Sequence, residues 1–285
     1  MNQSDNMQKE VEQLRIENRQ LLEQVELLNQ KLMESEAFKS HFLSNVTNEI
    51  VNPFSSIIGL SEQIMHLNQK DCSRAAELAA LIYAEASSLD FQLHNIFMAA
   101  RLEAGEEIPE PAKINLADWA NREIEKIKHE AAQKKIHLSF QQDENCNTFV
   151  SDRNKLSLIL LNLLSNAVHF SNEGKTVELK LYCRKGNLVL VVKDEGMGMT
   201  QQEKERIFDR FHRANPRIQS VSPGSGLGLA VVEGLLFLLN GKIEVDTAPG
   251  RGTTITVTVP EMNPEEIAFE DDLFFEENED SEESF

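Results

Sequence analysis

The first pattern along the chain is a heptad repeat near the amino terminus. Apolar residues and one Asn recur at alternating spacings of four and three: Met7, Val11, Leu14, Asn18, Leu21, Val25, Leu28 and Leu32. Val at one core position and Leu at the other favour a parallel two-stranded coiled coil, in which Asn18 fixes the register. We therefore expect a dimeric coiled coil over residues 1–36. The alternative is a single amphipathic helix packed on its own domain.

A second helical pattern covers residues 37–105. Its first helix contains Pro53, which should bend it because proline removes a backbone donor. After a polar gap the apolar spacing resumes, with Asp71 or Ser73 placed to cap the second helix and Gly105 placed to end it. Two long antiparallel helices led by a coiled coil make half of a dimeric four-helix bundle.

The pattern becomes mixed α/β at residue 115, after a proline-containing linker at 106–114. Asn115 and Asp152 stand where they can cap helices. The run at 187–194 is almost continuously apolar, as in a strand buried on both faces. We expect helices at 115–133, 153–170 and 227–239, and strands at 136–140, 148–152, 175–183, 187–194 and on either side of a turn at 249–252. Together they form one domain over 115–260.

Charge separates the last segment from the rest of the chain. The 285 residues include 28 Lys and Arg against 47 Asp and Glu, which gives a formal net charge of −19. Residues 261–285 hold 12 of the acidic residues and no basic residue, so removing them leaves −7. We expect a disordered acidic tail, or a docking peptide whose phenylalanines bind a partner.

Composition also excludes several classes of protein. The acidic balance argues against nucleic acid as a partner, because nonspecific binding needs basic residues. No apolar run approaches the ~20 residues of a membrane span, and the polar start is unlike a secretory signal. The three cysteines (Cys72, Cys146 and Cys183) are odd in number and scattered, which argues against a disulfide framework and favours a reducing compartment. We expect a cytoplasmic protein without membrane insertion.

Two polar motifs within the α/β region suggest nucleotide chemistry. Asn162 and Asn166 lie four apart on one face of a helix, where amide oxygens suit Mg²⁺. Asp194 follows a strand and precedes Gly196 and Gly198. Its carboxylate can accept a hydrogen bond from an adenine amino group, and the glycines let the backbone pass close to a ring. Either motif alone is weak, since paired Asn residues usually face solvent and an Asp before glycines is usually a turn.

A glycine-rich segment opens the last helix. It reads Gly224-Ser-Gly226-Leu227-Gly228, and backbone N–H groups at a helix amino terminus can bind phosphates. The preceding segment contains Phe208 and Arg210. Its aromatic residues can anchor a mobile lid and its arginines can meet phosphates, although an ordinary surface helix would look the same.

The ordered set resembles the nucleotide-binding boxes of the two-component sensor histidine kinase family, which is related to the gyrase, Hsp90 and MutL ATPases. Residues 42–59 and the run Arg101-Leu-Glu-Ala-Gly105 resemble the HisKA-type dimerisation and phosphotransfer domain of that family. The resemblance implies an α + α/β chain: a coiled coil and helical hairpin, then a GHKL (Bergerat) α/β sandwich that binds ATP and Mg²⁺. It implies Asn162 and Asn166 as Mg²⁺ ligands and nucleotide contacts from these residues together with His169 (in place of a common Lys), Asp194, Gly196, Gly198, Phe208, Arg210, Gly224, Gly226, Leu227 and Gly228.

The sequence departs from the family at the phosphoacceptor. The family's histidine falls on Asn48, whose amide nitrogen is not a useful nucleophile. Glu49 and Asn52 match residues that polarise the imidazole and place a water for dephosphorylating a response regulator. His41 is a candidate displaced acceptor, ~10 Å earlier along the helix axis, but it is more simply an exposed histidine.

Three functions remain open. The first is a histidine-kinase-type phosphotransferase in a phosphorelay, a homodimer through 7–105 that serves a response regulator receiver domain or another histidine kinase. The second is a pseudokinase that regulates or dephosphorylates a response regulator through Glu49 and Asn52. The third is a coiled-coil scaffold.

The hydrolysing ATPases related to this family have a Glu four residues before the position of Asn166. This chain has Asn162 there, which argues against a strand-passage or chaperone ATPase.

Overall fold

The computed structural model describes residues 50–67, 71–209 and 226–263, together with isolated helical positions between residues 15 and 29. The chain divides into two compact units, Met1–Val51 and Asn52–Phe285, which we consider separately. In the first unit the described positions are helical, and Leu21 and Val25 of the predicted seam are exposed in the single chain. Most of the expected coiled coil and of the acidic tail lies outside the described residues. Among the described residues, none of the helices combines the length and apolar composition that a membrane crossing requires.

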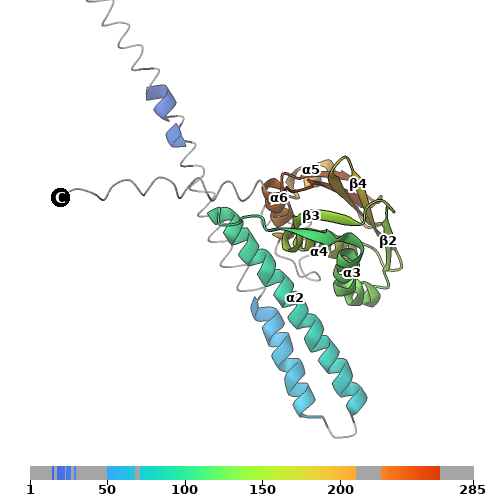
Figure 1. The fold of residues 1–285 in the computed structure, drawn as a ribbon. Helices are drawn as coiled ribbons and strands as arrows, with labels where there is room; N and C mark the ends of the chain where they lie inside the picture. The colour runs from blue at the N-terminus through green and yellow to red at the C-terminus, as the bar shows by residue number, and fades with distance from the viewer. Residues whose placement is uncertain are drawn as a thin grey trace, which may run out of the picture. The chain divides into compact units, whose positions relative to one another are not determined.

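Two helices form a hairpin at the start of the second unit (Figure 1). The first covers residues 50–65 and includes Pro53 in helical backbone, and the part of the predicted helix before Ile50 lies outside the described residues. The second, α2, spans Cys72–Ala104 and ends at Gly105 with a left-handed φ of 69°, as predicted. The predicted side-chain cap is wrong, since Asp71 occupies the N-cap position without a capping hydrogen bond from its side chain.

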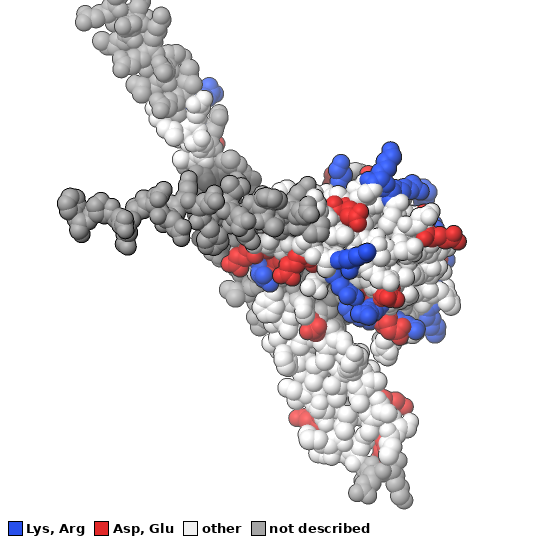
Figure 2. Space-filling model, in the orientation of Figure 1, with Lys and Arg blue, Asp and Glu red and all other residues white. Residues whose placement is uncertain are grey.

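The hairpin carries little charge on its surface. Figure 2 shows most of its visible face without Lys, Arg, Asp or Glu. Seven large apolar or aromatic side chains are exposed on the described hairpin: Val51, Phe54, Ile58, Met65, Leu81, Tyr83 and Phe97. Soluble proteins seldom leave such a surface uncovered, so the hairpin has the character of an interface.

An α/β domain with two sheets follows the hairpin (Figure 1). β1 (Pro111–Asn115) pairs antiparallel with β3 (Thr148–Asp152). The larger sheet has the order β2-β4-β5-β7-β6, in which only β2 and β4 run parallel. Its strands are β2 (His137–Gln142), β4 (Thr176–Arg184), β5 (Asn187–Lys193), β6 (Lys242–Thr247) and β7 (Thr253–Pro260), and the helices are α3 (Leu116–Gln133), α4 (Arg153–Phe170), α5 (Gln201–Arg206) and α6 (Gly228–Leu238).

The core lies between the larger sheet and the helices α3, α4 and α6. Alternate residues of the central strands are buried, such as Leu188, Leu190 and Val192 of β5. The expectation that 187–194 is buried on both faces is therefore wrong. The neighbouring strands of β5 are antiparallel, and a sheet of this kind needs a covering layer on one face only.

Several predicted boundaries are confirmed by their capping contacts, and two require correction. The Asn115 side chain accepts a hydrogen bond from Asp118 N at 3.1 Å, and Asp152 accepts one from Lys155 N at 3.0 Å.

The expected linker at 106–114 is wrong in its second half, because β1 begins at Pro111. Proline is tolerated at the first residue of a strand, which is why it misled the sequence interpretation.

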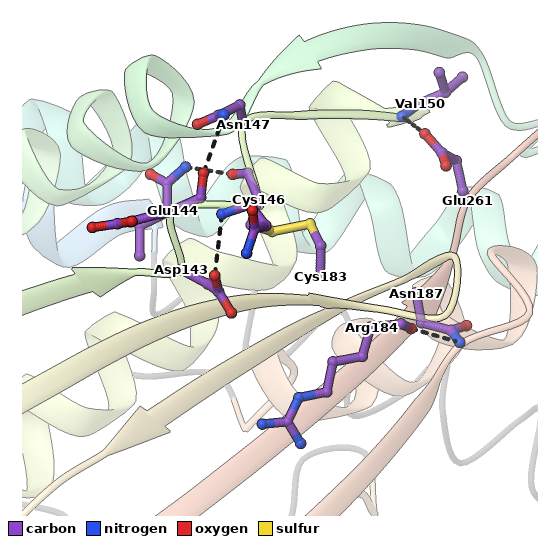
Figure 3. Close-up of a disulfide and its surroundings, with 11 residues drawn as sticks. Asp143, Glu144, Cys146, Asn147, Val150, Cys183, Arg184, Asn187 and Glu261 are labelled. Carbon is purple, nitrogen blue, oxygen red and sulfur yellow. Dashed lines mark hydrogen bonds between the residues drawn. A yellow bond between two sulfur atoms is a disulfide. The ribbon is translucent and has the colours of Figure 1, made fainter.

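The start of the predicted acidic tail also belongs to the folded domain. Met262 N donates to Val150 O at 2.9 Å, and the Glu261 carboxylate accepts from Val150 N at 3.1 Å (Figure 3). These two residues thus extend the domain past residue 260, and the acidic side chain of Glu261 has a structural role that composition alone did not suggest.

Cys146 and Cys183 form a disulfide, so the expectation of no disulfide is wrong (Figure 3). The two residues are 37 apart in sequence with Cα atoms at 5.0 Å. Gln142 at the end of β2 pairs with Leu181 of β4, which brings the turn after β2 beside Cys183. The parallel pairing of β2 with β4 creates this proximity, and cysteine spacing does not report it.

Buried charges fix the start of α4. Lys155, which is 5% exposed, places Nζ 2.8 Å from Asp152 Oδ2, 3.0 Å from Glu107 Oε2 and 2.9 Å from Ile108 O. Arg101 Nε of α2 lies 2.8 Å from Glu107 Oε1. Burial alone lowers the pKa of Lys155, but the hydrogen bonds to Asp152 and Glu107 outweigh it and leave the pKa raised. The end of α2, the connection after it and the start of α4 are thus joined by charge-assisted contacts.

Replacing Lys155 should destabilise the domain far more than replacing an exposed lysine. Lys155→Ala leaves buried Asp152 without its cation and Glu107 with Arg101 alone, a change that costs about 3–5 kcal/mol. The matched control is Lys128→Ala, because Lys128 pairs with Glu125 at 3.0 Å with both side chains exposed, and such pairs contribute about 0–1 kcal/mol. Urea denaturation of both variants measures the difference, and equal losses would contradict this account of the α4 start.

Removing the disulfide should lower the free energy of unfolding. A 37-residue loop corresponds to about 4 kcal/mol in the chain-entropy treatment of cross-links. Cys146→Ser with Cys183→Ser should therefore shift the urea midpoint downward, and Cys72→Ser should not. Thiol titration of the unfolded wild-type chain should give one reactive group without reductant and three with it. Three groups in both conditions would show that the disulfide is absent.

Candidate functional site

Asp194 is a buried and hydrogen-bonded side chain of the predicted site. It directly follows β5 and is 8% exposed. Its Oδ1 accepts hydrogen bonds from Gly196 N at 2.8 Å and Thr253 N at 3.1 Å, while its own N donates to Thr253 O at 2.8 Å. Burial raises the pKa of Asp194, and the two backbone hydrogen bonds act in the opposite direction. Oδ2 has no hydrogen bond within the described residues, so it is the oxygen left for a ligand.

Glycines let the backbone close around this carboxylate. Gly252, with φ of 76°, lies so close to Asp194 O that a Cβ would overlap it. Gly198, with φ of 62°, similarly approaches Ala248 O. Gly196 forms an isolated bridge with Ser171 just after α4. The loop after β5 is therefore held between the end of α4 and the turn at 249–252.

The two predicted metal ligands occupy different environments on α4. Asn162 is 3% exposed and donates through Nδ2 to Asn95 Oδ1 of α2 at 2.7 Å and to Leu158 O at 2.9 Å. Asn166 is half-buried, one turn later. The amide of Asn166 is accessible enough to reach a divalent cation, whereas that of Asn162 is enclosed in this conformation.

His169 is placed near the end of the same helix. Lys134 Nζ donates to the His169 carbonyl at 2.6 Å, and the imidazole meets the Phe170 ring edge to face with centroids 4.8 Å apart. The resemblance assigns this position to a lysine, whose ammonium has three donors, whereas an imidazole has at most two.

One cleft brings most of the predicted residues together. Its lining includes Asn162, Asn166, His169, Asp194, Gly198, Gly226 and Gly228, along with residues of α2 such as Asn95. Gly196 supports Asp194 through its N–H, and Leu227 is buried at the start of α6. The two Asn residues of α4, the Asp194 carboxylate and the glycines at the start of α6 thus line the same cleft.

Other predicted residues lie apart from this cleft or cannot be placed. Phe208 lines a separate depression with Leu102, Ala230, Gly234 and Phe237 at the junction of α2 and α6. Asn52 is exposed on the helix at 50–65. His41, Asn48, Glu49, Arg210 and Gly224 lie outside the described residues.

The domain matches a known family model. Residues 151–263 match the model described as "Histidine kinase-, DNA gyrase B-, and HSP90-like ATPase". The match and the mixed sheet with its helices support a GHKL-type α/β fold for this domain. The match leaves the hairpin outside, so the HisKA-type character of residues 37–105 remains a prediction.

Comparison with curated proteins finds sensor histidine kinases among the relatives of this chain. The chain is 28% identical over 254 residues to the circadian input-output histidine kinase CikA of Synechocystis, covering 86% of this chain and 34% of that protein. It is also 28% identical over 228 residues to the sensor-like histidine kinase SenX3 of Mycobacterium bovis, covering 80% and 55%. The chain thus spans about a third to a half of these relatives.

The fold of this chain also occurs in a solved structure. Full-length ShkA in complex with AMPPNP superposes with a TM-score of 0.56 at 23% identity, covering 78% of this chain and 46% of that one. At this identity the similarity establishes the fold.

Two residues of the site escaped the sequence interpretation. Thr253 holds Asp194 through its backbone N–H and C=O, which any residue type supplies, so no sequence signal marks it. Asn95 is a buried polar residue next to Ile96 on α2. A polar residue on the apolar face of a helix is a signal that points to a specific partner.

The two glycines of the 249–252 turn provide a matched test of how the Asp194 loop is held. Both Gly250 and Gly252 have φ of 76°, but a Cβ on Gly250 meets nothing within 4 Å. Gly250→Ala should lower the free energy of unfolding by about 1–2 kcal/mol, because a residue with a Cβ is strained in left-handed backbone. Gly252→Ala should cost more, because the new methyl group displaces the Asp194 backbone. Denaturant titration of the two variants measures this, and equal losses would contradict the close approach.

Proposed function

We propose that this chain is a histidine-kinase-like signal transduction protein that binds Mg-ATP for phosphoryl transfer in a two-component phosphorelay, and that it acts with a partner. The observation that carries the proposal is the Asp194 carboxylate. It is buried and fixed by two backbone N–H groups, with Oδ2 left for a ligand in the cleft that holds Asn166 and the glycines of α6.

Each part of the cleft has a distinct task in this proposal. Asp194 Oδ2 accepts a hydrogen bond from the adenine amino group, since an ionised carboxylate has only acceptor atoms. The backbone around Gly226 and Gly228, at the start of α6, faces the phosphates. Asn162 and Asn166 would hold Mg²⁺, which would neutralise phosphate charge during transfer. The AMPPNP complex of ShkA, which shares this fold, supports an adenine nucleotide as the ligand.

The acceptor of the phosphoryl group must lie on another molecule. Asn48 replaces the usual histidine, and an amide nitrogen is delocalised into its carbonyl. A histidine of another kinase in a mixed dimer, or a response regulator receiver domain, are the partners that fit two-component chemistry. The weakly charged, apolar face of the hairpin supports dimerisation through residues 7–105.

A second candidate is a pseudokinase that regulates or dephosphorylates a response regulator. The observation that favours it is the exposure of Asn52 on the helix at 50–65, with Glu49 three residues before it. In this reading ATP binding sets the conformation of the dimer, and the face with Glu49 and Asn52 acts on an aspartyl phosphate. A coiled-coil scaffold, the third candidate, requires no nucleotide.

Nucleotide binding should depend on Asp194. In Asp194→Asn, the amide oxygen would keep accepting from the Gly196 and Thr253 N–H groups. The NH₂ group would then face the adenine amino group, and two donors cannot form a hydrogen bond with each other. ATP should then bind about 10- to 100-fold more weakly, as expected for losing a charged hydrogen bond. Asp118→Asn, at an exposed position on α3, is the control and should bind as wild type. Isothermal titration measures the ATP affinity of both variants and of the wild type. If the wild type shows no measurable affinity for ATP, the proposal is overturned.

Incubation with γ-labelled ATP and Mg²⁺ then separates the candidates. Wild type should carry no acid-labile label, whereas Asn48→His should gain it if the cleft supports transfer. A label on wild type that disappears in His41→Ala identifies a displaced acceptor. Nucleotide binding without transfer in Asn48→His favours the pseudokinase.

A further inference from the structure

One face of the larger sheet has no covering layer among the described residues. Helices α3, α4 and α6 pack on the face that holds Leu188, Leu190 and Val192. The alternate residues of β4, β5, β6 and β7 point the other way and are half-buried or exposed. We call this second side of the sheet the open face. Cross-strand pairing places Tyr182 of β4 beside Val189 of β5 on it.

The end of the open face nearest the β4–β5 turn is basic. Arg184 ends β4, Lys185 lies in the turn, and Lys242 begins β6, whose pairing with β7 places it near the end of that strand. All three side chains are exposed. Among the described residues no carboxylate pairs with these cations, whereas Lys180, farther along the open face, pairs with Glu178 at 2.8 Å.

The contacts of Arg184 show which way the side chains at this end point. Its guanidinium carbon lies 5.4 Å from the centroid of the Tyr182 ring. Figure 3 shows the Arg184 side chain on the opposite side of β4 from Cys183 and its disulfide. The open face thus combines a basic end with an aromatic ring and two valines, Val189 and Val191. Such a surface fits an acidic segment that also carries aromatic residues.

The described part of the chain ends beside this basic surface. Glu261 N donates to Gly186 O in the β4–β5 turn at 2.8 Å, and Met262 N donates to Val150 O at 2.9 Å. The Glu261 carboxylate, the first of the acidic carboxyl-terminal run, already binds the domain through Val150 N. Residues 264–285 follow, with eleven Asp and Glu, four Phe and no Lys or Arg. The charge of this segment is therefore complementary to that of the surface next to it.

The length of residues 264–285 is sufficient to cover the open face. An extended chain advances about 3.3 Å per residue, and neighbouring strands lie about 4.8 Å apart. Phe269 comes six residues after Asn263, so it reaches about 20 Å from that residue, which is the width of the five strands. Phe274 and Phe275 reach farther. A tethered segment has an effective concentration of about 1 mM, so contacts that are weak in a free peptide can hold it.

We propose that the open face is the docking site of the chain's own carboxyl-terminal segment, residues 264–285. Carboxylates of the segment pair with Arg184, Lys185 and Lys242, and its phenylalanines pack on Tyr182 and Val189. Exposed ion pairs are individually weak, so the apolar contacts and the tether supply the rest of the binding. The inference does not depend on nucleotide binding or on the proposed function.

Carbodiimide cross-linking of the full chain tests this docking, because the reagent joins a carboxylate to a lysine only where the two groups touch. Peptides from residues 264–285 should be recovered on Lys185 and Lys242, the reporter lysines. They should appear about 5-fold less often on Lys128, an exposed lysine of α3. Raising the salt from about 0.05 M to about 0.5 M should reduce the cross-links to the reporter lysines, because salt screens exposed charges.

Charge reversal at Arg184 provides a matched test. Arg184→Glu keeps both reporter lysines and should lower their cross-links to residues 264–285 about 3-fold, through repulsion of the carboxylates. Arg122→Glu, at an exposed position of α3, is the control and should leave them unchanged. Phe274→Ser with Phe275→Ser retains every charge and should also lower the cross-links. If Arg184→Glu does not fold, this second variant still tests the docking.

Mixing isotopically heavy and light chains identifies the occupant of the open face. After the two are unfolded and refolded together, each cross-link should join peptides of the same mass, because the segment docks on its own domain. Cross-links of mixed mass in about half of the cases would place the segment on a second copy, as random pairing of equal amounts requires, and would overturn docking within one chain.

Three further outcomes would also contradict the proposal. The first is equal cross-linking to Lys128 and to the reporter lysines, which is the behaviour of a segment without a preferred site. The second is the absence of cross-links to the reporter lysines, which leaves the open face to an acidic partner protein. The third is a cross-linking yield that neither Arg184→Glu nor the double Phe substitution changes.

Discussion

The buried contact of Lys155 with Asp152 and Glu107 sets the position of α4, and the cleft depends on that helix. Asp152 caps α4 and accepts from Lys155 Nζ, so the same carboxylate begins the helix and neutralises the buried cation. One end of α4 is thereby fixed to the connection that follows α2, and its apolar residues, such as Ile159 and Leu163, fix the remainder in the core. Asn162 and Asn166 then stand at defined heights along the cleft, and the residue after the helix, Ser171, bridges to Gly196 beside Asp194.

A buried ion pair is weak evidence for net stability, since desolvation offsets most of the attraction. The buried charges around Lys155 instead specify which segment packs on the start of α4. An apolar replacement at Lys155 with apolar partners could fill the same volume, but it would not determine which segment lies over the start of α4. The charges require Glu107 to be at that place, and Glu107 in turn meets Arg101 of α2. The connection between the hairpin and the α/β domain is therefore specified by charge at the end of α2 and by the Asn95–Asn162 amide pair in its last third.

The sequence predicted the elements whose pattern is local and missed those that depend on distant pairing. Helix α4 was predicted with the bounds that the structure shows, because an N-cap Asp and an unbroken apolar face mark it. Strand β1 was taken for linker, because its only reason to be extended is the ladder with β3. The disulfide was excluded for a similar reason. Cys146 and Cys183 meet only because β2 and β4 are neighbours, and no spacing rule contains that information.

The same distinction holds within the site. Asp194 and the glycines were found because the chemistry of their side chains, or the lack of one, is visible in the sequence. Thr253 was missed because it acts through its backbone, and Asn95 because its partner lies 67 residues away.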